Sequence, residues 1–193
     1  MVYDHYTAQA DHPGAPLSEP SSNGQHDASG PNPDWDQVGD FFQRWYTQAP
    51  GIYELAFTPQ GGGKLYTGYA DNPVVALSLV QTAYTSDFWA GVYIILNPLE
   101  RVPEGRTLNG PMQGANTRAT NDMVARRYRL LIDADAVSDA RGTDEMATDA
   151  EQAEALALRD RVRRGLETLG WPDPAHVTSS GNGGGLIYRV ACR

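Results

Sequence analysis

The chain has 193 residues, 40% of them hydrophobic, which suffices for one domain with a sizeable core or for two small subdomains. Its net charge of −9 is uneven: residues 1–40 hold seven acids and no lysine or arginine, while the remaining acids nearly balance the 15 basic residues. The charge therefore does not exclude a nucleic-acid partner. The single cysteine, Cys192, excludes a disulfide framework and a cysteine-rich zinc site.

The N-terminus has no basic segment followed by an apolar core, so no signal peptide is evident. No apolar run approaches the roughly 20 residues that span a bilayer. A cytoplasmic protein without a membrane partner is the expectation. Residues 1–33 are rich in Pro, Gly, Ser and Asn and have few large apolar groups, so they predict a disordered acidic tail.

Ordered structure is expected from residue 34. Aromatic and apolar residues recur at helical spacing over residues 35–46, which predicts a helix with a core-facing stripe. Residues 52–58 and 64–69 alternate on either side of three glycines, a pattern typical of a β-hairpin. A short helix is expected after Asn72 and Pro73, and residues 90–96 predict a buried strand. A long loop over residues 100–121 follows.

The last third of the sequence predicts the order strand, helix, strand, strand. The helix begins at a capping box of Thr148 and Glu151, with Leu158, Val162, Leu166 and Leu169 as its apolar stripe. This order is the first two-thirds of a βαββαβ unit. We therefore expect an α+β fold, with an N-terminal αβ part over residues 34–125 and an incomplete ferredoxin- or RRM-like βαββ unit over residues 126–193. The chain is expected to be a fragment, because such a unit would still need a helix and a strand.

The predicted strand at residues 128–135 ends in Asp133 and Asp135. Residues two apart in a strand share a face, so both carboxylates are expected to project together. Two converging acids are tolerable if a hard cation such as Mg²⁺ lies between them. Where that cation also binds phosphate oxygens, the natural chemistry is phosphoryl or nucleotidyl transfer. The alternative is a buried strand that runs into a solvated acidic loop.

A glycine-rich turn at residues 180–185 is the second candidate element. Its glycines permit positive φ angles and expose backbone amides, which are the conditions for an anion-binding nest. The Ser180 hydroxyl adds a donor. A plain hairpin turn is the alternative. In a βαββ unit this hairpin and the carboxylate strand can lie in one sheet, so metal and phosphate donors could share one cleft.

The order NPL, RRYRLLIDAD, a Thr-capped helix ending LGWP, and SSGNGGGLIYRV resembles the catalytic domain of archaeo-eukaryotic primases, above all the primase-polymerase proteins of phages and plasmids. The resemblance covers about residues 36–193. It implies that Asp133 and Asp135 bind catalytic Mg²⁺ or Mn²⁺, and that the turn of Ser180, Gly181, Asn182 and Gly183 contacts the phosphates of an incoming NTP or dNTP.

The resemblance also implies a DNA template or primer as partner, and a helicase domain or protein as a possible further one. Gly185 stands where relatives commonly carry a histidine that helps to hold the phosphates, so a weakened site is compatible with the sequence. The third carboxylate of the family would lie beyond Arg193. The resemblance does not indicate a preference for NTP or dNTP, a template or an oligomeric state.

Six arginines precede or enter the carboxylate strand: Arg101, Arg106, Arg118, Arg126, Arg127 and Arg129. They predict a basic patch, and Arg126 and Arg127 are the candidates for contact with the nucleic-acid backbone. Pairing with nearby acids is an equal alternative. Two other functions stay open: a phosphatase with a DxDx[TV] motif, in which Asp133 would be the nucleophile, and a non-catalytic domain that binds nucleotide or nucleic acid through a degenerate site.

Overall fold

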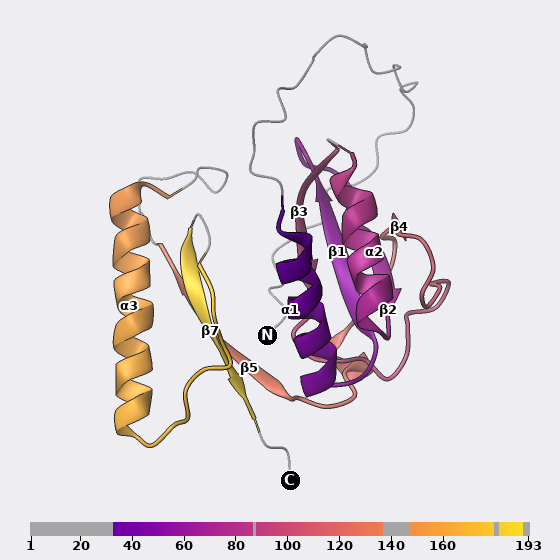
Figure 1. Cartoon of the computed structure of the whole chain (residues 1–193). Coiled ribbons are helices and arrows are strands. Elements are labelled where there is room, and N and C mark those ends of the chain that lie inside the picture. Colours follow the sequence, from indigo (N-terminus) through magenta and orange to yellow (C-terminus); the bar gives the residue numbers. More distant parts are fainter. Residues whose placement is uncertain (1–32, 87, 137–146, 180–181, 191–193) are drawn as a thin grey trace.

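The computed structural model describes residues 33–86, 88–136, 147–179 and 182–190. Helices and antiparallel sheets form two lobes side by side (Figure 1), so the predicted α+β class is confirmed. The predicted tail lies outside the described residues, apart from Pro33. Among the described residues, no helix has both the length and the apolar character that crossing a bilayer requires.

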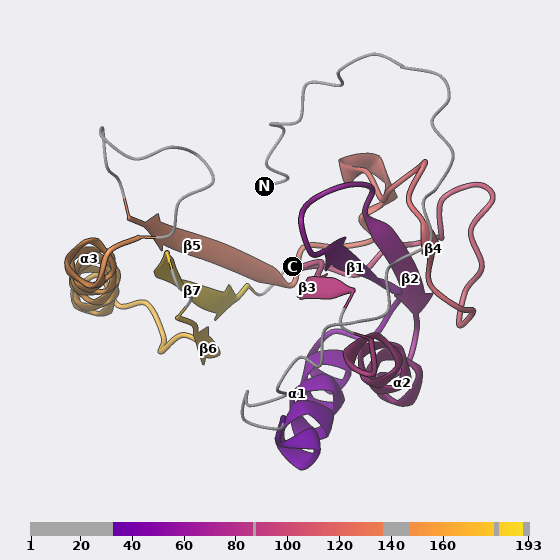
Figure 2. The same ribbon diagram turned by 90° about the horizontal axis from the view of Figure 1, so that it is seen from above.

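The N-terminal lobe is a four-stranded sheet with two helices on one face (Figure 2). Its strand order is β3-β1-β2-β4, and all three pairings are antiparallel. The expected helices and hairpin are present. The elements are α1 (Trp35–Gln48), β1 (Tyr53–Pro59), β2 (Tyr66–Ala70), α2 (Pro73–Tyr84), β3 (Trp89–Ile94) and β4 (Gln113–Gly114), followed by the 3₁₀ turn η1 (Asn121–Met123).

Local sequence explains where the two helices begin. The Asp34 carboxylate accepts the Gln37 N–H at 3.0 Å before α1, and the Asn72 side chain accepts the Val75 N–H at 3.0 Å before α2. Such side chains satisfy backbone donors that the first helical turn leaves free. The inner face of α1 then packs on the sheet through buried Phe42, Trp45 and Tyr46.

The expectation of a buried strand at residues 90–96 was wrong in one respect. The strand exists as β3, but it is the edge of its sheet, and Val92 and Tyr93 are 38% and 64% exposed. A short apolar run does not distinguish a central strand from an edge strand, because both can be rich in β-branched and aromatic residues.

The C-terminal lobe has the expected order of elements: β5 (Arg129–Asp135), α3 (Asp149–Thr168), β6 (His176–Val177) and β7 (Gly183–Arg189). The strands are antiparallel in the order β5-β7-β6. The predicted capping box at Thr148 is present. The predicted apolar stripe of α3 was partly wrong: Ala155 is buried, whereas Leu158 and Leu169 are 42% and 77% exposed.

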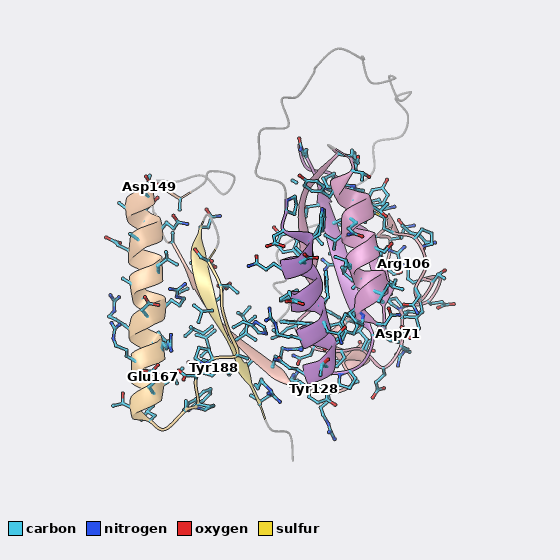
Figure 3. The ribbon with its side chains drawn as sticks, in the orientation of Figure 1. Asp71, Arg106, Tyr128, Asp149, Glu167 and Tyr188 are labelled. Carbon is cyan, nitrogen blue, oxygen red and sulfur yellow. The ribbon has the colours of Figure 1, made fainter. Side chains whose placement is uncertain are left out.

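The lobes meet where the chain enters β5, near Tyr128 (Figure 3). The Asn97 carboxamide accepts the N–H groups of Tyr128 and Arg129, at 2.7 and 2.9 Å, and donates to the Arg129 carbonyl at 3.1 Å. Arg129 is buried and donates to the carbonyls of Leu96 and Trp45, at 3.0 and 2.5 Å. Asn97 therefore attaches the start of β5 to the segment that follows β3.

Candidate functional site

The two aspartates lie at the end of β5, on the face of the C-terminal sheet that α3 does not cover. A Cβ built at Gly184 would lie 2.9 Å from both Leu156 Cδ2 and Arg159 Nη1, so this face of β7 contacts α3. Ala134 pairs with Gly184, and it is buried. Because side chains alternate along a strand, Asp133 and Asp135 project to the opposite face, where both are exposed.

The glycine-rich segment lies beside the carboxylates in the same sheet, as the sequence predicted. The register pairs Asp133 with Gly185 and Asp135 with Gly183. The segment differs from the prediction in one respect: β7 already begins at Gly183, so three of the glycines are strand residues and not turn residues.

Close packing accounts for two of these glycines. A Cβ at Gly183 would lie 2.1 Å from the Ala134 carbonyl oxygen, and one at Gly184 would lie 2.5 Å from the Thr178 carbonyl oxygen. Backbone cannot move aside cheaply, so these positions require glycine for a structural reason. At Gly185 the nearest atoms belong to side chains, Leu131 Cδ1 at 2.9 Å and Thr178 Oγ1 at 3.0 Å.

The electrostatics of the pair fit a cation site. Desolvation raises the pKa of the Asp133 carboxyl above its ordinary value, and the neighbouring charge of Asp135 raises it further. The ionised form of Asp133 is therefore disfavoured unless a positive charge lies close by.

The donor set also fits Mg²⁺ or Mn²⁺. Both ions prefer carboxylate oxygens, and Mg²⁺ commonly takes one or two carboxylates while water and substrate phosphates complete its shell. Within the described part of the chain, no group of three or more His, Cys, Asp or Glu side chains is close enough to hold an ion. Asp133 and Asp135 thus offer a two-carboxylate site that a substrate's oxygens would have to complete.

The turn before β7 is only partly described, since Ser180 and Gly181 lie outside the described residues. The structure gives Asn182 a structural contact on each side. Its carbonyl accepts the Ala136 N–H at 2.7 Å, and its Oδ1 accepts the Ala147 N–H at 2.9 Å. Asn182 therefore links Ala136, at the end of β5, to Ala147, just before the α3 cap. The resemblance to primase-polymerases had implied phosphate contact for this residue, not this link.

Three of the six arginines of the predicted basic patch are engaged within the fold. Arg106 donates to the Thr67 hydroxyl and to the Gly114 carbonyl, and Arg118 pairs with Glu54 at 2.9 Å. Arg129 is buried. Arg126 and Arg127 remain exposed where the chain approaches β5, and the Arg126 guanidinium lies 5.9 Å from the centre of the Tyr128 ring.

Sequence reasoning missed two buried charges. Glu54 is fully buried and accepts hydrogen bonds from the Tyr69 hydroxyl at 2.5 Å, the Ala119 N–H at 2.8 Å and the Arg118 guanidinium. These bonds tie the long loop to β1. The Arg129 guanidinium stacks on the Trp45 ring, 3.7 Å from its centre. The available signal was a charged residue inside an apolar strand pattern, at YELAF and at YRLLI.

No protein-family model, curated protein or solved structure matches this chain. A function therefore has to be inferred from the residues of the site itself.

Proposed function

We propose that this chain carries the metal-binding part of a primase-polymerase site, which transfers a nucleotide to the 3′ end of a nucleic acid. The observation that supports the proposal best is the position of Asp133 and Asp135. Both are exposed on the sheet face opposite α3, and partial desolvation, together with the neighbouring charge of Asp135, raises the pKa of Asp133. This is the arrangement that a divalent cation relieves.

Each residue has a defined part in this proposal. Asp133 and Asp135 hold Mg²⁺ or Mn²⁺, and a bound ion offsets the charge of the triphosphate and of the leaving pyrophosphate. Arg126 and Arg127 contact the phosphates of a DNA template or primer. Asn182 keeps the glycine-rich strand in register with the carboxylates, through the Ala136 N–H. An NTP or dNTP is the proposed substrate.

The first test is titration of a dNTP with Mn²⁺ or Mg²⁺ into the wild-type chain and into the Asp133→Asn/Asp135→Asn double variant. We expect metal-dependent binding that the variant loses. A Glu104→Gln variant is the matched control, because Glu104 is also an exposed acid but lies in a loop of the other lobe. Equal binding by wild type and double variant, or binding by neither, would contradict the proposal for this chain. Primer extension with labelled dNTPs then tests catalysis.

A non-catalytic domain that binds nucleotide or nucleic acid is the second candidate. Gly185 favours it, because glycine provides no side chain to hold phosphates. It is also favoured because the described residues include no third ligand beside Asp133 and Asp135. The same titration with a primer-extension assay separates the two: this candidate predicts binding without extension.

A phosphatase with Asp133 as nucleophile predicts instead an acid-stable aspartyl phosphate, which a nucleotidyltransferase never forms.

A further inference from the structure

The C-terminal sheet contacts α1 through a histidine that lies among aromatic rings. The centre of the His176 ring is 5.5 Å from that of Trp45 and 6.0 Å from that of Phe41. Ile187, which pairs with His176 across β6 and β7, belongs to the same hydrophobic cluster as Trp45. The packing of β6 and β7 against α1 therefore includes one titratable ring.

A second attachment between the lobes contains no histidine and no carboxylate. It consists of the Asn97 carboxamide on the backbone of residues 128 and 129, and of the Arg129 guanidinium on two carbonyls and the Tyr53 hydroxyl. Amides do not ionise near neutral pH, and arginine stays protonated. This attachment lies where the chain passes from one lobe to the other, so a rotation of one lobe relative to the other would be centred on it. We call it the pivot.

The surroundings of His176 disfavour its charged form. Its Nε2 is buried and has no hydrogen-bond partner among the described residues. Burial lowers the pKa of the imidazole, and the nearby cations Arg129 on β5 and Arg44 on α1 lower it further. The ring also contacts the aromatic rings of Phe41 and Trp45, and its strand partner is the apolar Ile187. The charged neighbours that shift its pKa are both cations.

We propose that His176 is a pH-sensitive latch, which holds β6 and β7 against α1 when it is neutral and releases these two strands when it is protonated. Release leaves the pivot at Asn97 and Arg129 intact, so the lobes separate without unfolding. The sheet that moves carries Asp133 and Asp135, so the latch sets how that face lies relative to α1. The proposal goes beyond the proposed function and does not depend on it.

The test measures the distance between the lobes as pH falls. Fluorescent dyes on Gln43→Cys of α1 and Ala157→Cys of α3, both exposed positions, report energy transfer in a Cys192→Ser background. Between pH 8 and pH 5 we expect transfer to fall in one step, with a midpoint below the ordinary histidine value of 6.5. A His176→Phe variant keeps an aromatic ring but cannot titrate, and its transfer should stay constant.

Loss of transfer in the His176→Phe variant, as in wild type, would overturn the proposal, and so would constant transfer in wild type over this range. If the phenylalanine variant fails to fold, Arg44→Gln replaces it, because Arg44 is exposed and its loss should not disturb the core. Removing this cation should move the midpoint up toward 6.5. A midpoint that stays unchanged, or that falls, would count against the latch. Neither measurement uses nucleotide or metal, so failure here leaves the proposed function untouched.

Discussion

Asp133→Asn should stabilise the metal-free protein at neutral pH. The pKa of the Asp133 carboxyl is raised in the folded state. Its protonated form therefore contributes to stability fully below pH 3.8, the ordinary pKa, and this contribution is lost as pH rises through the raised pKa. At pH 7 the ionised carboxylate therefore opposes folding, and a neutral amide of the same shape removes that cost.

The size of the effect follows from the geometry of the strand. Residues two apart lie roughly 7 Å from each other, so two unit charges repel by about 0.6 kcal/mol in water and by about 2.4 kcal/mol at an effective dielectric of about 20. Both carboxylates are exposed, which places the value near the lower figure. We expect a gain of about 1 kcal/mol, which for a domain of this size is roughly 2–4 °C in Tm.

Calorimetry with EDTA at pH 7 and at pH 4 measures this gain, with Glu104→Gln as the control for removal of one acid. The gain should shrink at the lower pH. With Mg²⁺ or Mn²⁺ in place of EDTA, the Tm of wild type should exceed that of Asp133→Asn, since an ion that binds only the folded wild type stabilises it by mass action. A Tm for Asp133→Asn at or below that of wild type in EDTA at pH 7 would refute the reasoning.

Four further substitutions test the packing of the fold. Glu54→Gln should lower the free energy of unfolding in urea by about 3 kcal/mol, because its amide nitrogen would face a donor, either the Arg118 guanidinium or the Ala119 N–H. Gly184→Ala should cost about 3 kcal/mol and Gly185→Ala less than about half of that, because a Cβ at Gly184 would meet a backbone oxygen at 2.5 Å, whereas the nearest atoms at Gly185 are side-chain atoms at 2.9 and 3.0 Å. Equal Tm losses would contradict this. Arg129→Lys keeps the charge but cannot reach three acceptors at once, so we expect it to lower Tm and, in urea, to cost about 2–4 kcal/mol.

Local signals allowed most elements to be predicted. The Asp34 and Asn72 caps, the capping box at Thr148 and the glycines of the hairpin each act over a few residues, so a single sequence contains them completely. The order of elements also indicated that the carboxylate strand and the glycine-rich hairpin can lie in one sheet, but not that the two strands are direct neighbours.

The errors arose where distant residues decide the outcome. Whether β3 has a neighbour on both sides, and which side of α3 faces the sheet, depends on the assembled fold and not on the local pattern. The same holds for the arginines: Arg118 lies 64 positions from Glu54 in sequence, and nothing near either residue indicates that they pair. A cluster of like charges in sequence therefore overstated the positive charge available to a ligand.

The glycine-rich motif illustrates why a pattern alone cannot assign a function here. Gly183 and Gly184 are required by backbone contacts, and the Asn182 side chain accepts the Ala147 N–H through its Oδ1, so three residues of the motif have structural reasons to be what they are. A residue that the fold requires can also bind a ligand. However, because the fold already explains these residues, the motif is not independent support for a binding role. Asp133 and Asp135 have no such explanation, since both are exposed and their proximity costs stability. The argument for a metal site therefore depends on the carboxylates, and the glycines only determine how closely β7 lies beside them.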